Sequence, residues 1–456
     1  MISLHDLTVR LNAKIIGPDI LFQNLSTDSR AIKPGDLFVA LRGDRFDGHQ
    51  FIEQAVMHGA CAVVVDQPQQ DLVVPQLVVN DTCEALGQIA AFNRSKFNGQ
   101  VIAITGSSGK TSVKGLLREI LALDNSIVAT PGNFNNHIGV PLSLMQLNTQ
   151  KRAVMELGTS HPGEIAYLVN LVQPDIALVN NIMPAHIAGF GTLEAIAEEK
   201  SSIYSTLSDQ QIAVINIDDD FVKIFENKTA HCQRIGYSVE HRAKNYPVLT
   251  AKNISSSSNG DSTFDLSFNE ETVSVRLHVP GAHSVRNALA AAACALAAGC
   301  SLPIIAQGLA LFTGVSGRMQ RKTGINQACV IDDTYNANSG SVKAAIDYLS
   351  SLSGKRILVL GDLGELGELS EQTHCELGQY ALQKHIDAVY CCGQFALMTA
   401  QGFGGNAHVF QEQSTLVNEL MPVLDSSTTV LVKGSRSAHM EHVVKALCQN
   451  EEHSPC

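Results

Sequence analysis

The segment 101–115, VIAITGSSGKTSVKG, constrains the fold of this chain more strongly than any other stretch of its sequence. The apolar run 101–104 has the length and composition of a central strand, and 106–109 carries the glycines of a tight turn. The residues from Lys110 onward are typical of a helix. A strand, a glycine-rich loop and a helix in this order form a cradle for phosphate, because glycines let the backbone approach the oxygens and the helix N-terminus presents free N–H groups. The segment therefore predicts an α/β unit with an anion-binding loop.

This loop is two residues shorter than the usual phosphate-binding loop. The common pattern, G-x-x-x-x-G-K-[ST], requires a glycine where this chain has Ile104. Two interpretations are open: a nucleotide site of a different design, or a glycine-rich turn with an exposed lysine. The strand before the loop and the helix after it favour the nucleotide site. The residues predicted to contact ATP and its Mg²⁺ here are Thr105, Gly106, Ser107, Ser108, Gly109, Lys110 and Thr111.

The length of the chain predicts more than one such unit. At 456 residues it is expected to form three domains of about 150 residues each. We place a small N-terminal α/β domain at 1–82, a central domain with a mostly parallel sheet at 83–312, and a Rossmann-like, doubly wound domain at 313–456. The polar, alternating segment 253–281 predicts antiparallel hairpins at one edge of the central sheet. Thr82 is the predicted N-cap of the helix that opens the central domain.

Charge and cysteine content argue against several classes of protein. With 32 Lys and Arg against 44 Asp and Glu, the net charge of −12 argues against a nucleic-acid binder. The eleven cysteines include no C-x-x-C pair, which favours free thiols in a reducing cytosol over disulfides or zinc. The N-terminus has no apolar signal region, and the alanine-rich run 287–305 predicts a buried helix. We expect a cytoplasmic monomer without a membrane span.

The loop T-G-x-x-G-K-T resembles that of the Mur ligases and their relatives, the folylpolyglutamate synthetases, which form amide bonds with ATP. Further segments match the family in order and spacing over all three predicted domains. They are GNFNNHIGVPLSL at 132–144, MELGTSHPGEI at 155–165, VNNIMPAHIAGFG at 179–191, AEEKSSIY at 197–204, GAHSVRNALAAA at 281–292, SGRMQ at 316–320, DDTYNANS at 332–339 and VKGSRS at 432–437.

Two of these segments are similar to one member of the family. DDTYNAN and VKGSR resemble the ligase that joins D-alanyl-D-alanine to UDP-N-acetylmuramoyl-tripeptide. The D-N-P-R motif of the ligase that adds the third amino acid is absent, whereas STDSRAIKPGDLFVAL at 26–41 occurs in both ligases. The resemblance therefore implies an enzyme of peptidoglycan precursor synthesis that acts on ATP, UDP-N-acetylmuramoyl-tripeptide and D-alanyl-D-alanine through an acyl phosphate.

The resemblance also implies the catalytic and metal-binding residues. Lys110 is expected to hold the β- and γ-phosphates, and Thr111 and Glu156 to hold one Mg²⁺. His186 is the expected ligand of a second Mg²⁺, together with Lys200 after its amine has reacted with CO₂ to form a carbamate. Without the family pattern, Lys200 is typical of a solvated helix lysine and His186 of a core histidine.

Nucleotide and substrate contacts are implied in all three predicted domains. Asn287 is expected at the adenine with His283 near the base, and helix capping is the alternative for both. Arg318 and Asp333 are expected to reach the phosphates and ribose, so the site would be complete when the domains close. The expected substrate contacts are Ser29 and Arg30 at the UDP end, where a surface turn is the alternative, and Asn135, Asn136, Ser160, Asn336, Asn338, Lys433 and Arg436.

The sequence departs from the family pattern at several positions. Ser160 and Ser284 stand where the family has Asn, Ser339 stands where proline is common, and no Gly-Glu follows Lys200. None of these differences removes a residue that the chemistry requires. Two alternatives stay open: a sibling enzyme, either the third-residue ligase or a folylpolyglutamate-type ligase, and a P-loop nucleotide switch that does not ligate.

Overall fold

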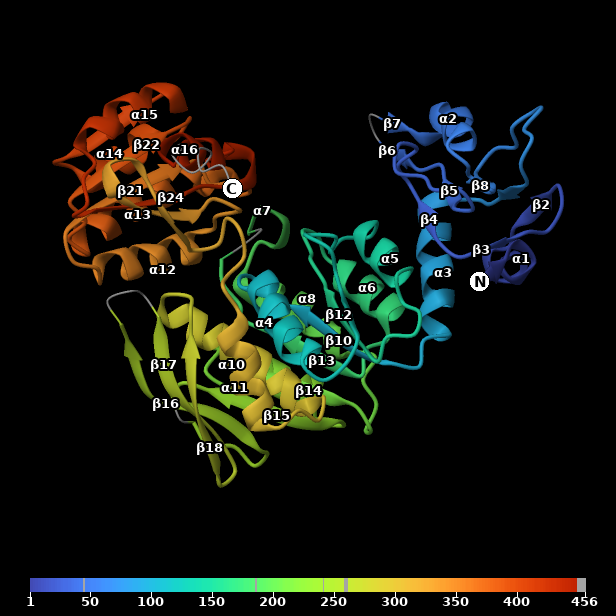
Figure 1. Cartoon of the computed structure of the whole chain (residues 1–456), viewed down its shortest axis with the longest axis horizontal. Coiled ribbons are helices and arrows are strands. Elements are labelled where there is room, and N and C mark those ends of the chain that lie inside the picture. Colours follow the sequence, from blue (N-terminus) through green and yellow to red (C-terminus); the bar gives the residue numbers. More distant parts are fainter. Residues whose placement is uncertain (44–45, 185–186, 241, 258–260, 449–456) are drawn as a thin grey trace, which may run out of the picture.

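The structure, a computed structural model, describes residues 1–43, 46–184, 187–240, 242–257 and 261–448. The chain forms three lobes that follow one another along the sequence, each with a β-sheet at its centre and helices packed on it (Figure 1). The predicted α/β class with three sheet-based units is confirmed. The boundaries after residues 82 and 312 stay predictions.

The first lobe is a small α/β unit around a five-stranded sheet. Its strand order is β2–β9–β8–β5–β4, with β2 antiparallel to β9 and the other neighbours parallel. The elements of this lobe are β1 (Ile2–Ser3), α1 (Leu4–Leu11), β2 (Lys14–Ile16), β3 (Leu21–Phe22), β4 (Leu25–Ser26), β5 (Leu37–Val39), β6 (Arg42–Gly43), β7 (Phe46–Asp47), α2 (Ile52–Met57), β8 (Ala62–Val65) and β9 (Gln76–Val78). Both faces of the sheet pack against apolar side chains, and one of these cores continues into the central lobe.

Helix α3 (Thr82–Ser95) connects the first lobe to the central lobe (Figure 1). Its N-cap is Asp81, whose carboxylate accepts hydrogen bonds from the backbone N–H groups of Cys83 at 2.7 Å and Glu84 at 2.9 Å. The predicted N-cap, Thr82, is therefore wrong by one residue, because Thr82 is the first helical residue. An ionised Asp81 also suits the positive end of the helix dipole better than a neutral hydroxyl does.

The central lobe is built on a nine-stranded mixed sheet with the order β11–β12–β10–β13–β14–β15–β16–β17–β18. Neighbours from β11 to β16 are parallel and the last two pairs are antiparallel, which confirms the predicted parallel sheet with an antiparallel edge. The strands are β10 (Gln100–Thr105), β11 (Ile127–Ala129), β12 (Arg152–Glu156), β13 (Ile176–Val179), β14 (Ile212–Asn216), β15 (Gln233–Ser238), β16 (Val248–Ser256), β17 (Ser262–Phe268) and β18 (Glu271–Leu277).

The register of three parallel strands places the phosphate loop beside two polar residues. On β10, Ile104 is paired with Glu156 of β12. The next residue, Thr105, is paired with Val179 of β13, and Asn180 follows directly. Because the carboxyl ends of parallel strands meet at one edge of the sheet, the loop, Glu156 and Asn180 are neighbours there.

Helices cover both faces of the central sheet, which explains why its middle strands are apolar and buried. The helices of this lobe after α3 are α4 (Lys110–Ala122), α5 (Gly139–Leu144), α6 (Glu164–Val172), α7 (Ile187–Phe190), α8 (Leu193–Ser201), α9 (Val222–Lys228), α10 (Ala282–Ala297) and α11 (Leu302–Leu311). The single helix predicted over 287–305 is wrong, because α10 ends before Gly299, which has φ +85°, and α11 begins after Ser301. No helix in the described part of the chain is both long and apolar enough to cross a membrane.

The third lobe contains a six-stranded sheet with the order β19–β20–β24–β21–β22–β23. All neighbours except β19 and β20 are parallel, and helices with separate apolar cores lie on the two faces, so the predicted doubly wound arrangement is confirmed. The elements are β19 (Gln320–Thr323), β20 (Cys329–Asp333), α12 (Ser339–Ser350), β21 (Lys355–Gly361), α13 (Ser370–Gln383), β22 (Ala388–Cys392), α14 (Ala396–Phe403), β23 (Ala407–Phe410), α15 (Gln413–Leu420), β24 (Thr428–Lys433) and α16 (Glu441–Leu447).

His374 of α13 is a buried polar side chain inside the third lobe. Its Nε2 accepts a hydrogen bond from the backbone N–H of Leu363 at 3.1 Å, and its Nδ1 donates to the carbonyl oxygen of Ser370 at 2.7 Å. Burial lowers the pKa of His374, while the Ser370 carbonyl and the charge of Asp362 oppose the shift. A neutral imidazole ring therefore joins the segment after β21 to α13.

We expect acid to weaken this part of the third lobe. Because the pKa of His374 is lower in the folded chain than the ordinary value of 6.5, the unfolded chain binds the proton first. The stability that the neutral His374 contributes is therefore fully present above about pH 6.5 and is lost as the pH falls below it. The equilibrium constant for local opening should rise by up to about tenfold per pH unit. Hydrogen–deuterium exchange of residues 361–378, corrected for the intrinsic rate, measures this loss. In the His374→Gln variant, exchange of these residues should depend less on pH. In the control variant His5→Gln, which changes an exposed histidine, it should depend on pH as in the wild type. An undiminished pH dependence in His374→Gln would contradict this explanation.

Candidate active site

The loop after β10 has the geometry of an anion cradle. Gly106 and Gly109 have φ values of +150° and +78°, a conformation that side chains disfavour. A Cβ on Gly109 would lie 2.4 Å from Oδ1 of Asn287 and 2.7 Å from Nδ2 of Asn180, so only glycine fits. Helix α4 begins at Lys110 without a side-chain cap, which leaves the N–H groups of its first turn available to an anion.

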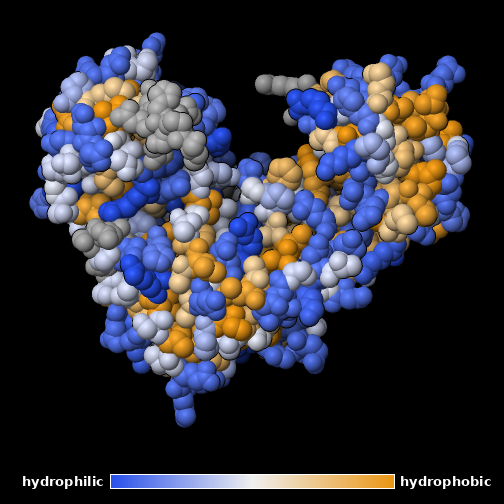
Figure 2. Space-filling view, viewed as in Figure 1, coloured by the Kyte–Doolittle hydropathy of each residue, from blue (hydrophilic) through white to orange (hydrophobic). Residues whose placement is uncertain are grey.

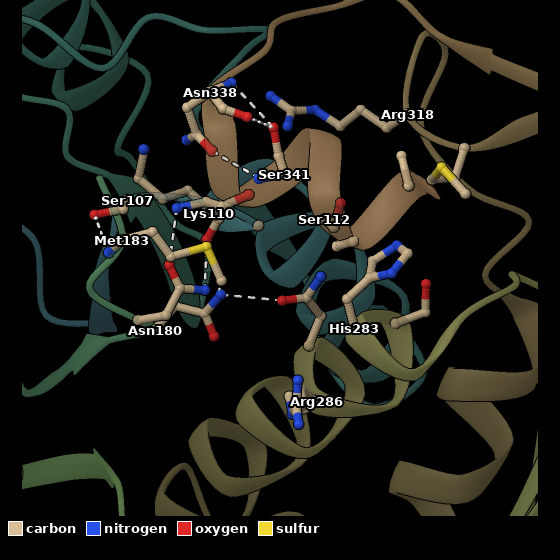
Figure 3. A pocket seen from close by; sticks show the side chains of 18 of the residues that line it. Ser107, Lys110, Ser112, Asn180, Met183, His283, Arg286, Arg318, Asn338 and Ser341 are labelled. Atoms are coloured by element: carbon tan, nitrogen blue, oxygen red, sulfur yellow. Dashed lines mark hydrogen bonds between the residues drawn. The ribbon is translucent and has the colours of Figure 1, made fainter. Parts of the chain in front are cut away.

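Lys110 is placed to neutralise such an anion. Its Nζ donates a hydrogen bond to the carbonyl oxygen of Gly106 at 2.7 Å and lies at the wall of a cavity (Figure 3). Burial lowers the pKa of Lys110, with Glu156 opposing the shift and Arg318 adding to it. The ammonium is therefore held by one neutral oxygen, which a phosphate oxygen can replace.

Glu156, at the end of β12, is 1% exposed and is held by three side chains. Thr111 Oγ1 donates to the carboxylate, at 3.1 Å from Oε2 and 3.2 Å from Oε1. Asn135 Nδ2 donates to Oε1 at 2.9 Å, and Lys114 Nζ forms an ion pair with Oε2 at 3.0 Å. Burial raises the pKa of Glu156, but the charges of Lys114 and Lys110 and the hydrogen bonds from Asn135 and Lys114 together outweigh burial, so the pKa lies below its ordinary value.

The loop opens into a cavity of about 390 Å³ between the central and third lobes (Figure 3). Helix α10 contributes His283 and Arg286 on one side, and α12 contributes Asn338 and Ser341 on another. The predicted site residues that line this cavity are Ser107, Ser108, Gly109, Lys110, His283, Asn287, Arg318, Asp333, Asn336, Asn338 and Lys433. Residues far apart in the sequence therefore meet around one space.

Helix α10 is tied directly to the phosphate loop. Asn180 Nδ2 donates to Oδ1 of Asn287 at 3.0 Å and to the carbonyl oxygen of Ser108 at 2.9 Å. Burial lowers the pKa of His283, with the charge of Asp333 opposing the shift. The N-cap of α10 is Gly281 without any side-chain hydrogen bond, so the capping alternative for His283 and Asn287 is wrong.

The third lobe reaches the loop through Arg318. Its Nη2 donates to Thr111 Oγ1 at 3.0 Å, and its guanidinium lies 4.3 Å from the ring centroid of Tyr335. The Nε of Arg318 is buried and has no hydrogen-bond partner in the described part of the chain. Asp333 is paired with Lys433, whose Nζ lies 2.5 Å from its Oδ2 and also donates to a backbone oxygen.

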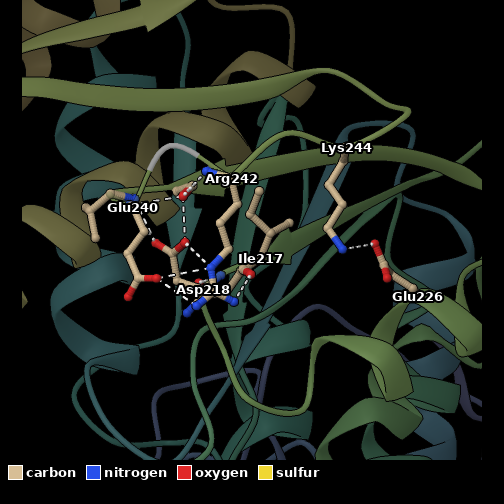
Figure 4. A network of polar contacts seen from close by, with 9 residues as sticks. Ile217, Asp218, Glu226, Glu240, Arg242 and Lys244 are labelled. Atoms are coloured by element: carbon tan, nitrogen blue, oxygen red, sulfur yellow. Dashed lines mark hydrogen bonds and ion pairs between the residues drawn. The ribbon is translucent and has the colours of Figure 1, made fainter.

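An acidic wall closes another side of the cavity, formed by Asp218, Asp219, Asp220 and Glu240. Figure 4 shows how Asp218 is held: its Oδ1 accepts a hydrogen bond from Ser238 Oγ at 2.5 Å, and its Oδ2 accepts one from the N–H of Val239 at 2.7 Å. Arg242 forms ion pairs with Asp218 at 3.8 Å and with Glu240 at 2.7 Å (Figure 4). Fixed carboxylates of this kind can accept hydrogen bonds from amino or hydroxyl groups of a ligand.

Lys200 is a buried lysine of α8 that lies outside this cavity lining. Its side chain is 1% exposed, and its Nζ makes no hydrogen bond or ion pair with another described residue. Burial and then the charge of Lys110 hold the pKa of Lys200 well below its ordinary value, against the opposing charges of Glu199 and Glu164. Burial therefore disfavours the ammonium form of Lys200 and favours the amine, the form that can act as a nucleophile. His186, the other predicted ligand of the second Mg²⁺, lies outside the described residues.

The predicted contacts to the UDP end lie in the first lobe, away from this cavity (Figure 1). Ser29 Oγ donates to Gln54 Oε1 at 2.9 Å. The side chain of Arg30 is 80% exposed and forms an ion pair with Asp28 at 2.8 Å. The guanidinium is therefore open to solvent, and its role in binding stays a prediction.

Four other predicted substrate residues hold local structure. Asn136 Oδ1 accepts a hydrogen bond from the backbone N–H of Gly139 at 2.8 Å, and Asn338 caps α12. The backbone N–H of Ser160 donates to Glu164 at 2.6 Å. Arg436 Nη1 lies 3.2 Å from Oε1 of Glu441. The substrate role of these four residues stays a prediction.

Family models match most of the chain. They are "Mur ligase family, catalytic domain" at residues 21–94, "Mur ligase middle domain" at 104–295, and "Mur ligase, glutamate ligase domain" at 317–436. The UDP-N-acetylmuramoyl-tripeptide–D-alanyl-D-alanine ligase of Escherichia coli strain K12 is 41% identical over 454 residues, which cover 98% of this chain and 99% of that relative. The chain belongs to the Mur ligase family. The family resemblance predicted from the sequence is confirmed, and with it an ATP-dependent amide-bond ligase.

Solved Mur ligase structures have the same fold. MurF from Acinetobacter baumannii superimposes with a TM-score of 0.91 at 36% identity, covering 98% of both chains. The MurF ligase from Thermotoga maritima, solved in complex with ADP, gives a TM-score of 0.84 at 27% identity and covers 94% of this chain and 97% of its own.

Sequence reasoning missed three residues of this Mur ligase site. Lys114 lies four residues after Lys110, which places both on one side of α4. Asn180 directly follows β13, and Asp218 follows β14 closely. Spacing along a helix and position after a buried strand are the signals that could have identified these residues.

Proposed function

We propose that this Mur ligase joins D-alanyl-D-alanine to UDP-N-acetylmuramoyl-tripeptide with consumption of ATP, which yields the UDP-N-acetylmuramoyl-pentapeptide for peptidoglycan synthesis. The observation that carries the proposal is the meeting of the phosphate loop, Glu156 and Arg318 between two lobes. A relative that is 41% identical over 98% of this chain is named for the ligation of D-alanyl-D-alanine. This name favours the dipeptide as the amine substrate over the amines of the sibling ligases. Because that relative is a ligase, it also argues against a nucleotide switch that does not ligate. In this proposal the enzyme acts as a cytoplasmic monomer.

The reaction needs positive charge where two anions meet. A carboxylate oxygen of the tripeptide attacks the γ-phosphorus of ATP, ADP leaves, and the product is an acyl phosphate. The amine of the dipeptide then attacks the acyl carbon, and phosphate leaves as the amide forms. Lys110 and Arg318 supply the charge that lowers the repulsion in the first step. Separation of the acyl phosphate from water is the expected purpose of a site that lies between lobes.

Two oxygen-bearing side chains beside the loop, one from α4 and one from β12, fit Mg²⁺. A hydroxyl on Thr111 and an ionised carboxylate on Glu156 are hard oxygen ligands 3.1 Å apart. When bound, the cation supplies charge that stabilises the phosphate oxygens. Lys200 does not fit a cation site as an ammonium, but its amine is buried and has no partner among the described residues, which supports a carbamate that would provide an anionic oxygen. His186 is the proposed further ligand of that second site.

The two substrates are proposed to approach from opposite lobes. A wide groove separates the first and third lobes above the central lobe (Figure 2). Ser29 and Arg30 lie on the first lobe and are proposed to hold the UDP end of the long substrate. Asn336, Asn338 and Arg436, on the third lobe, are proposed to face the dipeptide.

The test is phosphate release by the purified full-length enzyme with each substrate added or omitted. We expect turnover of ATP only when UDP-N-acetylmuramoyl-tripeptide is present, and amide product only when D-alanyl-D-alanine is added as well. With ¹⁸O in the terminal carboxyl group of the tripeptide, one labelled oxygen should be found in the phosphate. ATP hydrolysis that ignores both substrates would favour a nucleotide switch, and product formation with a diamino acid instead of the dipeptide would favour the sibling ligase.

A further inference from the structure

Lys114 is a buried lysine that the reaction proposed above does not use. It lies one helical turn after Lys110 on α4, and its side chain is only 8% exposed. Its side chain is not among those that line the cavity, where Lys110 is proposed to meet a phosphate. A buried ammonium is unfavourable unless its charge is compensated, so this position requires an explanation.

Two contacts fix the ammonium of Lys114. Its Nζ lies 3.0 Å from Oε2 of Glu156, whose side chain is 2% exposed. The same Nζ donates a hydrogen bond of 2.6 Å to the carbonyl oxygen of Gly132. The backbone oxygen and the carboxylate together hold the lysine in one position.

The carboxylate of Glu156 has two lysines near it, and they differ in what holds them. Among the described residues, Lys110 is bound by the Gly106 carbonyl oxygen alone, and it faces the cavity, so it can turn toward a ligand. Lys114 is buried and stays on Oε2. Without Lys114, the remaining lysine charge near Glu156 would be that of Lys110, which makes no ion pair that fixes the carboxylate in its present orientation.

We propose that Lys114 is a positioning residue that holds the carboxylate of Glu156 oriented toward Thr111 as a ready ligand for the divalent cation. Lys114 contacts Glu156 rather than the cation or the nucleotide. The inference rests on the proposed function, in which Glu156 and Thr111 hold Mg²⁺. Groups that orient a metal ligand from behind typically contribute about 10- to 100-fold to metal affinity.

The test is the Kd of Mn²⁺ for the full-length enzyme saturated with ADP, measured from the free Mn²⁺ signal in electron paramagnetic resonance. Lys114→Met, which keeps the length but removes the charge, should weaken Mn²⁺ binding about 10- to 100-fold. Glu156→Gln should weaken it at least as much. In the double variant, Lys114→Met should add nothing to the effect of Glu156→Gln, because both changes act on the same carboxylate.

The double variant also controls for folding. Lys114→Met alone leaves a buried carboxylate without its partner, whereas the double variant replaces both charges with neutral groups of similar size. If the single variant does not fold, the comparison of Glu156→Gln with the double variant decides: equal Kd values support the inference and a further loss overturns it.

The remaining outcomes separate the inference from the proposed function. A wild-type Kd for Lys114→Met overturns the positioning role alone. A wild-type Kd for Glu156→Gln overturns the metal-binding role of Glu156, and with it the basis of the inference. If the two substitutions raise the Kd of Mn²⁺ by factors that multiply in the double variant, the positioning role is also overturned, because Lys114 would then act through a group other than Glu156.

Discussion

Lys110→Ala should lower the rate of peptide joining by about a thousandfold or more, because it removes the charge that lets two anions approach each other. In the described part of the chain the ammonium of Lys110 is held only by the Gly106 carbonyl oxygen, and it faces the cavity, so it has one hydrogen bond to exchange for a phosphate oxygen. Arg318 also lines the cavity, but its Nη2 is already bound to Thr111. The measurement is product formation with saturating substrates, together with the affinity for ATP.

The matched control is Lys223→Ala, which removes an exposed lysine of α9. This variant should keep the wild-type rate within about twofold, since exposed charges away from a site contribute little. Because Lys110 makes only one hydrogen bond to the protein, Lys110→Ala should also melt near the wild-type temperature. A Lys110→Ala enzyme that joined the substrates at the wild-type rate would remove the basis of the proposed mechanism.

The parts of the site that could be predicted from the sequence are those set by local structure. The phosphate loop depends on one strand, one turn and one helix, so its residues identify it without the rest of the chain. Glu156 could be placed because it ends a buried strand, and parallel strands bring such ends together. The family pattern added the residues of α10 and of the third lobe, several of which do line the same cavity.

The parts that could not be predicted depend on contacts between distant segments. Asp333 and Lys433 were both expected at a ligand, but they are also paired with each other across two neighbouring strands, which no local signal indicates. Lys114 was missed because it lies on α4 while its partner, Glu156, ends strand β12. The single helix predicted across Gly299 was wrong for a different reason. The high alanine content favoured one continuous helix, although Gly299 is a typical helix stop and Pro303 a typical helix start.

The other large effect is expected at Lys200. Lys200→Ala should lower ligation by about a hundredfold or more, since it removes the anionic oxygen that a carbamate would supply to the second cation. The physical case is the buried amine: it is 1% exposed, its Nζ has no described partner, and its pKa is held well below the ordinary value. The lowered pKa favours the neutral amine, which can attack CO₂, over the ammonium, which cannot.

The carbamate can be separated from a purely structural role of Lys200. Acetate or formate should restore part of the activity of Lys200→Ala, because a small carboxylate can enter the vacated space. The control, Lys228→Ala, removes an exposed lysine that pairs with Glu198 on the same helix as Lys200, and it should neither lose activity nor respond to acetate. Wild-type enzyme in ¹³C-bicarbonate should show a carbamate carbon by nuclear magnetic resonance, and Lys200→Ala should not. Absence of that carbon, with no rescue by carboxylates, would mean that Lys200 acts as an amine, and the second metal site would then need a different ligand.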